Sequence, residues 1–240
     1  PYSVAWIDLM RTGASMGRSI LGRGSFAPLD ALPEKDRTPA RARAFHPTTR
    51  ATFPPVAPNG LINPLTVTAF NELWYRKAPK RRRDELQSIT TFFHPLDMVD
   101  RWNRVYGPIG FLQWQFALPF GEEEVLRRII GALCDEGCTS FLAVLKRFGA
   151  GNPGHLSFPI PGWTLALDIP AGPSSLAHLL DRLDHEVVAA GGRIYLAKDS
   201  RVRPELLDAM YPRLDDWREI RARVDPRAVL RSDLARRLGL

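Results

Sequence analysis

One predicted strand ends in residues that do not belong in a protein core. The segment YLAKDSR (195–201) begins with an apolar run and continues into Lys198, Asp199 and Ser200. A strand that merely runs out into solvent would end in this way. Alternatively, the strand carries the ammonium group of Lys198 to a fixed point where a negative group is held.

Other polar side chains stand on predicted strand faces that would otherwise be apolar. In GFLQWQFALP (110–119) two glutamines alternate with large apolar residues, and a lysine does the same in LAVLKRF (142–148). Each alone fits a solvated sheet, since antiparallel sheets often meet water on one face. Together they predict the wall of a pocket for a polar, anionic small molecule. The residues are Trp6, His94, Gln113, Gln115, Lys146 and Lys198.

Two familiar catalytic signatures are missing from the sequence. It contains neither the P-loop spacing G-x-x-x-x-G-K-[ST] nor H-E-x-x-H. Cys134 and Cys138 have no second Cys or His pair at ligand spacing. We therefore interpret the cysteines as small buried thiols and predict no metal site.

Composition and charge limit the classes of function. The chain has 240 residues, 45% of them hydrophobic, and a formal net charge of +7, which favours an anionic partner. The basic run from Arg76 to Arg83 fits a solvated loop or a phosphate-binding segment. Because no nucleic-acid-binding motif accompanies it, we expect no nucleic-acid partner. No apolar stretch in this sequence is long enough to span a membrane, and we expect neither a transmembrane segment nor a signal peptide within these 240 residues.

Hydrophobic periodicity predicts a mixture of strands and helices, which is an α+β pattern. The predicted strands are 3–10, 17–27, 86–93, 110–119, 139–149, 162–170 and 193–197. The predicted helices are 64–77, 98–107 after an Asp97 cap, 121–137, 174–192, 203–210, 213–224 and 232–240. The proline-rich stretch 28–58 is expected to be a long loop.

Several segments resemble the decaprenylphosphoryl-β-D-ribose 2-oxidase family, FAD-linked flavoproteins of the vanillyl-alcohol-oxidase fold. They include YSVAWID, FNELWYRKAP, FHPLDMVDRWNRVYGPIGFLQWQFALP, LSFPIPGWTLALDIP and GGRIYLAKDSR. The segments occur in order from Tyr2 to the C-terminus. The resemblance implies an antiparallel sheet-based substrate domain flanked by helices over residues 1–192. It also implies that residues 193–240 supply a strand and short helices that would complete a separate FAD-binding domain.

The N-terminal FAD-binding domain of this family has no counterpart in the chain, and we expect a fragment. The opening PYSVAWID, which lacks an initiator methionine, agrees with that expectation. FAD is the implied cofactor, and the implied reaction oxidises the ribose 2-hydroxyl of a polyprenyl-phosphoryl-β-D-ribose to the 2-keto sugar. This is the first step of epimerisation to the arabinose donor for cell-wall polysaccharide. The implied partner is a short-chain-dehydrogenase-type reductase, with a location in the cytoplasm or peripheral to the inner membrane.

The resemblance also assigns roles to individual residues. Lys198 would be the catalytic lysine at the flavin ring, and Tyr195 would contact FAD. A fixed cation there would stabilise the negative charge that hydride transfer leaves on the ring. The substrate pocket would be lined by Trp6, His94, Gln113, Gln115, Val144, Lys146, Phe148 and Thr164, with Lys146 meeting the phosphate.

The sequence departs from mycobacterial members at Phe93, Thr164 and Ala166, where they carry tyrosine, asparagine and cysteine. These departures bear on the lipid or sugar preference and not on the oxidation itself. Two alternative functions stay open. An FAD-linked aldonolactone or alditol oxidase would share the fold, and a soluble lactone would then reduce the flavin. A non-catalytic anion-binding protein would instead bind polyanions through the basic run, with a steep dependence on salt.

Overall fold

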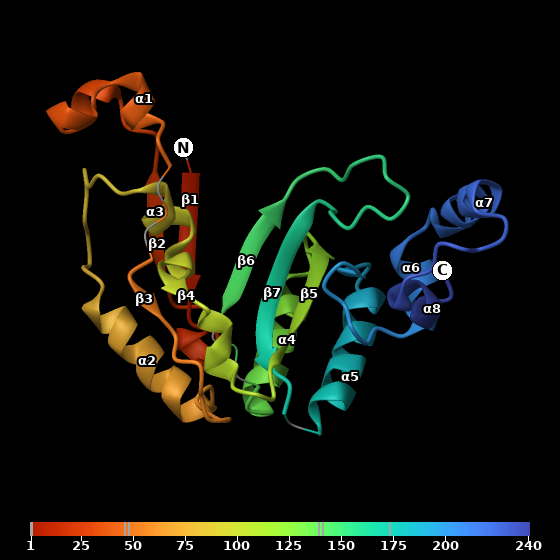
Figure 1. Cartoon of the computed structure of the whole chain (residues 1–240). Helices are drawn as coiled ribbons and strands as arrows, with labels where there is room; N and C mark the ends of the chain where they lie inside the picture. The colour runs from red at the N-terminus through yellow and green to blue at the C-terminus, as the bar shows by residue number, and fades with distance from the viewer. Residues whose placement is uncertain (1, 46, 48, 139, 141, 173) are drawn as a thin grey trace. The chain divides into compact units, whose positions relative to one another are not determined.

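The structure, a computed structural model, describes residues 2–45, 47, 49–138, 140, 142–172 and 174–240. The chain divides into two compact units, Pro1–Gly110 and Phe111–Leu240 (Figure 1). Helices mix with antiparallel strands, so the predicted α+β class is confirmed.

The first unit is built around a two-stranded antiparallel sheet of β1 and β2. A second, parallel pair joins β3 to β4 with Ala51 opposite Val99. The elements are β1 (Tyr2–Ile7), β2 (Ser19–Gly24), α1 (Pro39–Ala42), β3 (Ala51–Thr52), α2 (Pro64–Lys77), α3 (Ile89–Phe93) and β4 (Val99–Asp100).

Two predictions in this unit are wrong. Residues 86–93, predicted as a strand, contain helix α3, because the Ser88 hydroxyl caps it by accepting a hydrogen bond from Thr91 N at 3.1 Å. Residues 98–107, predicted as one helix, contain β4 and a 3₁₀ turn. Between them Arg101 lies in the left-handed region at φ 57°, which interrupts a right-handed helix.

Helix α2 covers the predicted range 64–77 and has Asn63 as its N-cap. Its large apolar side chains do not form its buried face. Leu65, Leu73 and Trp74 are 79%, 68% and 48% exposed, whereas Val67 and Asn71 are buried. Asn71 turns inward because its amide donates to the buried carboxylate of Asp8 at 2.8 Å. The hydrogen bond between Asn71 and Asp8 thus decides which side of α2 packs against the rest of the first unit.

The second unit contains a four-stranded antiparallel sheet in the order β6-β7-β5-β8. Gly162, where β7 begins, has no room for a side chain, since a Cβ there would lie 1.9 Å from the Leu118 carbonyl oxygen. The elements are β5 (Phe111–Pro119), α4 (Glu123–Asp135), β6 (Ala143–Phe148), β7 (Gly162–Pro170), α5 (Leu176–Ala189), β8 (Arg193–Ile194), α6 (Leu207–Met210), α7 (Leu214–Val224) and α8 (Asp233–Leu238).

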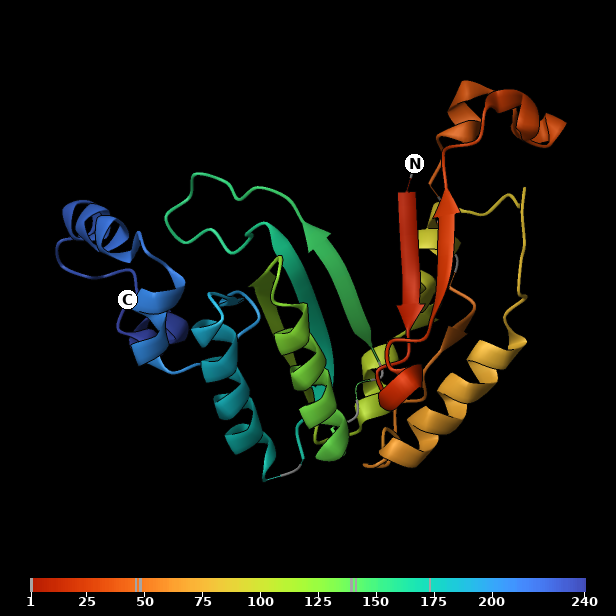
Figure 2. The ribbon, with the colours of Figure 1, turned by 180° about the vertical axis from the view of Figure 1, so that it is seen from behind.

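One face of this sheet forms the core with α4 and α5. Seen from behind, α4 lies in front of the sheet with α5 beside it (Figure 2). Trp114 and Phe116 of β5 and Leu165 and Leu167 of β7 are buried on this face. Burying each such side chain contributes roughly 1.5–3 kcal/mol. The predicted alternation of β5 is therefore confirmed, and its glutamines lie on the opposite face.

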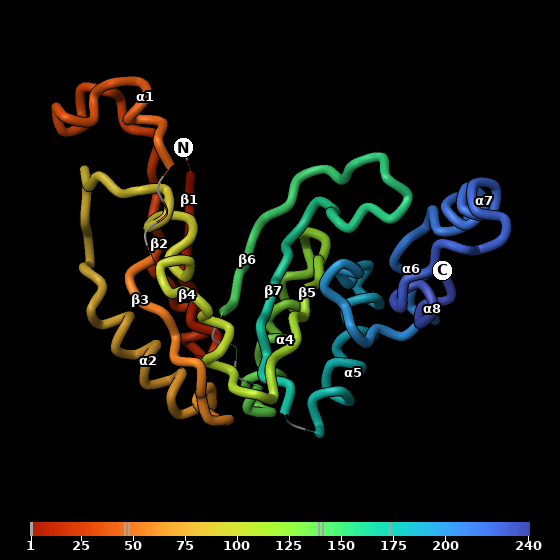
Figure 3. The backbone as a smooth tube through the Cα atoms, viewed as in Figure 1, coloured from red at the N-terminus to blue at the C-terminus, as the bar shows by residue number. Residues whose placement is uncertain are grey.

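The C-terminal segment packs against the edge of the same sheet. The predicted strand 193–197 is a strand only at Arg193 and Ile194, and the chain then turns at Leu196–Lys198 and runs on to α6, α7 and α8 (Figure 3). The Tyr211 hydroxyl donates to the Ile194 carbonyl at 2.9 Å and so covers the edge. That residues 193–240 would complete a separate FAD-binding domain stays a prediction.

Candidate functional site

The face of the sheet that points away from α4 and α5 collects most of the predicted site residues. Directly paired residues of an antiparallel sheet project to the same face. Gln115 and Val144 both lie opposite Ala166, and Lys146 lies opposite Thr164. The Tyr195 N–H donates to the Gln115 carbonyl at 2.8 Å, which continues the hydrogen-bond ladder beyond β8 and places Tyr195 on the same face. The side chains that share this face are Gln113, Gln115, Val144, Lys146, Phe148, Thr164, Asp168 and Tyr195. We call this set the polar face.

Gln115 and Thr164 are joined across the polar face by a hydrogen bond. The Gln115 amide donates to the Thr164 hydroxyl at 3.1 Å, and that hydroxyl donates to the Phe116 carbonyl at 2.8 Å. Thr164 is 1% exposed, so its hydroxyl is fixed by these bonds. The Gln115 amide nitrogen is thereby oriented toward β7, and its oxygen remains an acceptor for a ligand.

A buried carboxylate lies at the other end of the polar face. Asp168 is 2% exposed and accepts a hydrogen bond from the Gln113 amide at 2.7 Å on Oδ1. Its Oδ2 atom is buried and has no hydrogen-bond partner among the described residues. Burial raises the pKa of Asp168, while the Gln113 hydrogen bond and the charge of Lys198 lower it. The carboxylate of Asp168 is therefore electrostatically coupled to Lys198.

Three aromatic rings form one wall of the polar face. Phe158, in the loop between β6 and β7, stacks on Tyr195 with ring centroids 4.4 Å apart. The same ring meets Phe148 edge-on at 5.7 Å. The rings leave an apolar surface beside the amides, which is the usual make-up of a small-molecule site.

Lys198 sits in a turn that neighbouring charges hold in place. The Asp199 carboxylate accepts from the backbone N–H groups of Arg201 and Val202 at 2.9 and 2.8 Å, and from Arg237 of α8 at 2.5 Å. Arg201 in turn donates to Asp184 of α5. Among the described residues Lys198 itself forms no ion pair. These contacts hold the backbone of the turn, and the Lys198 ammonium group is left without a direct carboxylate partner among the described residues.

Trp6 and His94, the remaining predicted pocket residues, belong to the first unit. Trp6 is half-buried on β1 opposite Ile20, and His94 is exposed after α3, with its ring 6.3 Å from that of Phe93. The polar face belongs to the second unit, so the role of these two residues in the pocket stays a prediction.

Sequence reasoning missed Asp168 and Phe158. Asp168 follows Thr164 and Ala166 in the period of two along β7, and that alternation could have revealed it. Two motif spacings were also missed. Residues 13–17 read G-x-S-x-G but form a turn between the antiparallel strands β1 and β2, not a strand-to-helix elbow. Residues 149–154 read G-x-G-x-x-G but open a loop after β6, not a helix.

The cysteines are half-buried and reduced in the structure. Burial, followed by the charges of Glu136 and Cys134, raises the pKa of Cys138 to about 11, which makes it a poor nucleophile. Among the described residues no three His, Cys, Asp or Glu side chains are grouped as metal ligands would be. No helix in the part of the chain that the structure describes has the length and apolar character to cross a bilayer.

Comparison with known proteins agrees with the predicted resemblance. Over 240 residues the chain is 46% identical to decaprenylphosphoryl-β-D-ribose oxidase of Mycolicibacterium smegmatis and covers 51% of that protein. The chain is a relative of this oxidase. It is also 45% identical over 249 positions to an uncharacterized protein in the mprA 5′ region of Streptomyces coelicolor, and covers 66% of it. The family model of D-arabinono-1,4-lactone oxidase matches residues 177–238.

The resemblance to decaprenylphosphoryl-β-D-ribose oxidase is thus confirmed at the level of sequence. The chain spans between about half and two thirds of the length of these curated relatives. The matched lactone-oxidase region contains β8, the Lys198 turn and the C-terminal helices. The residues of the candidate site that match both the oxidase and the lactone-oxidase family model are therefore Tyr195 and the turn that carries Lys198.

Proposed function

We propose that this chain forms the substrate side of an FAD-dependent oxidase that converts the 2-hydroxyl of a polyprenyl-phosphoryl-β-D-ribose to a ketone. The observation that carries the proposal is the polar face, where amides, aromatic rings and a buried carboxylate lie beside the ammonium group of Lys198. The similarity to decaprenylphosphoryl-β-D-ribose oxidase over the whole chain supports it.

The residues present fit a flavin at one end of the polar face. Tyr195, stacked on Phe158, and the unpaired ammonium of Lys198 would hold the ring system. When bound, FAD would accept the hydride that leaves the sugar carbon. Lys198 would supply a positive charge at the ring, and the bonds of Asp199 would hold the backbone of the turn that carries it.

The remaining side chains of the polar face would position the sugar. Gln115, oriented by Thr164, would accept a hydrogen bond from a sugar hydroxyl, and Phe148 would pack against the ring. Lys146 is exposed at the strand edge of the face and would meet the phosphate. Asp168 would balance the charge of Lys198 when the site is empty.

The polyprenyl chain of such a substrate implies contact with a membrane surface. Helix α2 exposes Leu65, Leu73 and Trp74, and its end leads into the basic run Arg76–Arg83. Apolar and basic side chains together favour an anionic bilayer surface, so we assign peripheral membrane contact to this helix. The keto product would be reduced by a partner enzyme of the short-chain-dehydrogenase type.

The proposal is tested by the absorption spectrum of the full-length protein before and after polyprenyl-phosphoryl ribose is added without oxygen. We expect a yellow protein that bleaches with the substrate. Lys198→Met should abolish bleaching, whereas Lys35→Met, which changes an exposed lysine outside the basic run and the polar face, should bleach like wild type. A Lys198→Met protein that binds flavin and bleaches at the wild-type rate would refute the role of Lys198.

A second candidate function rests on the match of residues 177–238 to the D-arabinono-1,4-lactone oxidase family. An oxidase of aldonolactones would use the same Lys198 turn and would need no polyprenyl group. In the same anaerobic experiment, a soluble lactone would bleach the flavin and polyprenyl-phosphoryl ribose would not. A colourless protein that does not take up added FAD would exclude both oxidases and leave anion binding by the basic run.

A further inference from the structure

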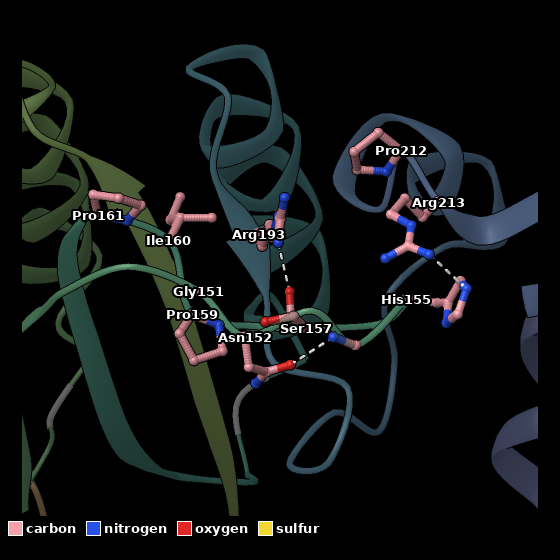
Figure 4. A pocket seen from close by; sticks show the side chains of 11 residues that line it. Gly151, Asn152, His155, Ser157, Pro159, Ile160, Pro161, Arg193, Pro212 and Arg213 are labelled. Carbon is pink, nitrogen blue, oxygen red and sulfur yellow. Dashed lines mark hydrogen bonds between the residues drawn. The ribbon is translucent and has the colours of Figure 1, made fainter. Parts of the chain in front are cut away.

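A small pocket lies where the loop between β6 and β7 meets Arg193 of β8 and the residues before α7 (Figure 4). Its volume is about 270 Å³. Pockets for drug-sized ligands measure roughly 300–1,000 Å³, so this one suits a small group. We call it the loop pocket; its lining comes from Gly151 to Pro161, with Arg193, Pro212 and Arg213.

The glycine-rich part of the loop is held in a fixed shape. A Cβ on Gly151 would lie 2.6 Å from the Pro159 carbonyl oxygen, and one on Gly154 would lie 2.8 Å from Asn152 Oδ1. Asn152 Oδ1 accepts a hydrogen bond from the Gly154 N–H at 2.9 Å. The oxygen of the Asn152 amide is therefore used within the loop, and its NH₂ group is left as a donor.

The charges around the loop pocket are positive. Arg193 donates one guanidinium N–H to the Ser157 carbonyl and forms no ion pair among the described residues (Figure 4). Arg213 is fixed by the Pro153 carbonyl at 2.8 Å, by Asp216 at 3.2 Å and by the ring of His155 at 2.8 Å. No carboxylate lines the pocket. Arg193 is thus the cation whose charge is left without a counter-ion.

Ser157 provides a second, independent indication of a ligand. Its hydroxyl is buried and has no hydrogen-bond partner among the described residues. Buried hydroxyls without a partner are rare and unfavourable. An acceptor atom placed in the loop pocket would satisfy this donor together with the remaining donors of Arg193.

We propose that the loop pocket binds a phosphate-class dianion through Arg193, Ser157 and Asn152. A phosphate group offers several acceptor oxygens to converging donors, and guanidinium groups match its geometry. Arg213, partly neutralised by Asp216, adds positive potential at the rim. Free phosphate, the diphosphate of a nucleotide cofactor and the phosphoryl group of a sugar substrate share this chemistry. The site lies apart from Lys146, for which a phosphate was predicted, since Lys146 is on β6 and does not line the pocket.

The test is calorimetric titration of inorganic phosphate into the full-length protein, prepared in phosphate-free buffer. We expect saturable binding that weakens about 10- to 100-fold in Arg193→Gln and about three- to tenfold in Ser157→Ala. Ser157→Ala keeps the backbone carbonyl that Arg193 holds, so it decides the matter should Arg193→Gln fail to fold. Arg218→Gln is the control, because Arg218 is exposed and pairs with Asp208 and Asp215 outside the pocket.

An absence of binding by wild type, or equal affinity in wild type and Ser157→Ala, would overturn the proposal. Because no flavin or sugar is added, this result is independent of the proposed oxidase. The source of the phosphate is then assigned with Ser157→Ala. If Ser157→Ala retains FAD more weakly than wild type, and phosphate competes with FAD for binding to wild type, the ligand of the loop pocket is the cofactor diphosphate. A raised KM for the phosphorylated sugar at unchanged FAD content would assign the substrate, and neither change would assign free phosphate.

Discussion

The hydrogen bond between Gln113 and Asp168 gives the sharpest test of the polar face. Gln113 is the side chain that donates to a carboxylate 2% exposed to solvent. Gln113→Leu would leave both oxygens of Asp168 without a partner among the described residues. Hydrogen bonds to charged groups contribute about 1.5–3 kcal/mol, so we expect the free energy of unfolding to fall by about 2–3 kcal/mol at pH 7.

Gln115→Leu is a matched control on the same strand and the same face. Its amide donates to a neutral hydroxyl that keeps the Phe116 carbonyl as a second partner. We expect a loss of about 1 kcal/mol, because a neutral hydrogen bond contributes about 0.5–1.5 kcal/mol. Urea unfolding of the full-length variants at pH 5 and pH 8 would measure both losses.

The pH dependence of the Gln113→Leu stability would show that the buried carboxylate of Asp168 causes the loss. Burial already raises the pKa of Asp168, and the Gln113 hydrogen bond lowers it. Without that bond the pKa of Asp168 rises further, so the Gln113→Leu protein loses stability as the pH rises and recovers part of it as the pH falls. Equal losses in the two variants, or a Gln113→Leu loss that is the same at both pH values, would refute this reasoning. In an Asp168→Asn background the two losses should become similar.

Three further predictions concern the elements that support the site. Phe158→Ala should cost about 3–5 kcal/mol of unfolding free energy in urea, since it removes a buried ring; a change under 1 kcal/mol would show that Phe158 is not packed on Tyr195. Arg237→Gln should cost about 2 kcal/mol and speed amide hydrogen exchange at Val202, which unaltered exchange would contradict. Burial raises the pKa of Asp184 to about 6 from 3.8, so the free energy of unfolding should fall as the pH rises between about 4 and 6. This pH dependence should disappear in Asp184→Asn. If it persists in that variant, another group causes it.

The sequence predicts an element well where its periodicity is strong and its ends are marked. Strand β5 was predicted with its two faces, because Gln113 and Gln115 alternate with large apolar residues over its length. The stretch 86–93 was misassigned because Ile89, Thr90 and Thr91 favour strands in isolation. The cap at Ser88 outweighs that preference, and its effect depends on local geometry that composition does not contain.

The sequence named most residues of the polar face, but it did not predict how they pair across the strands. Alternation along a strand places Lys146 with Val144, but it does not tell which residue of β7 lies opposite. The sheet pairing gives that register directly, with Lys146 opposite Thr164. Phe158 lies in a loop, and loops lack the regular repeat that would predict from the sequence which way a side chain points. Asp168 was missed because a carboxylate in a strand is expected to be exposed, and its burial follows from packing of the complete unit.

The polar residues at the end of strand β8 have two separate tasks. Asp199 and Arg201 bind α8 and α5, respectively, in partly buried ion pairs whose desolvation offsets much of their attraction. Their net contribution to stability is therefore modest, and what they provide is position. The residue whose backbone they position, Lys198, forms no ion pair among the described residues, and the buried carboxylate of Asp168 is its electrostatic neighbour. A strand that merely ran out into solvent would not need ion pairs to anchor the turn that follows it. The anchored backbone brings Lys198 to a defined place, where its cation would meet a developing negative charge.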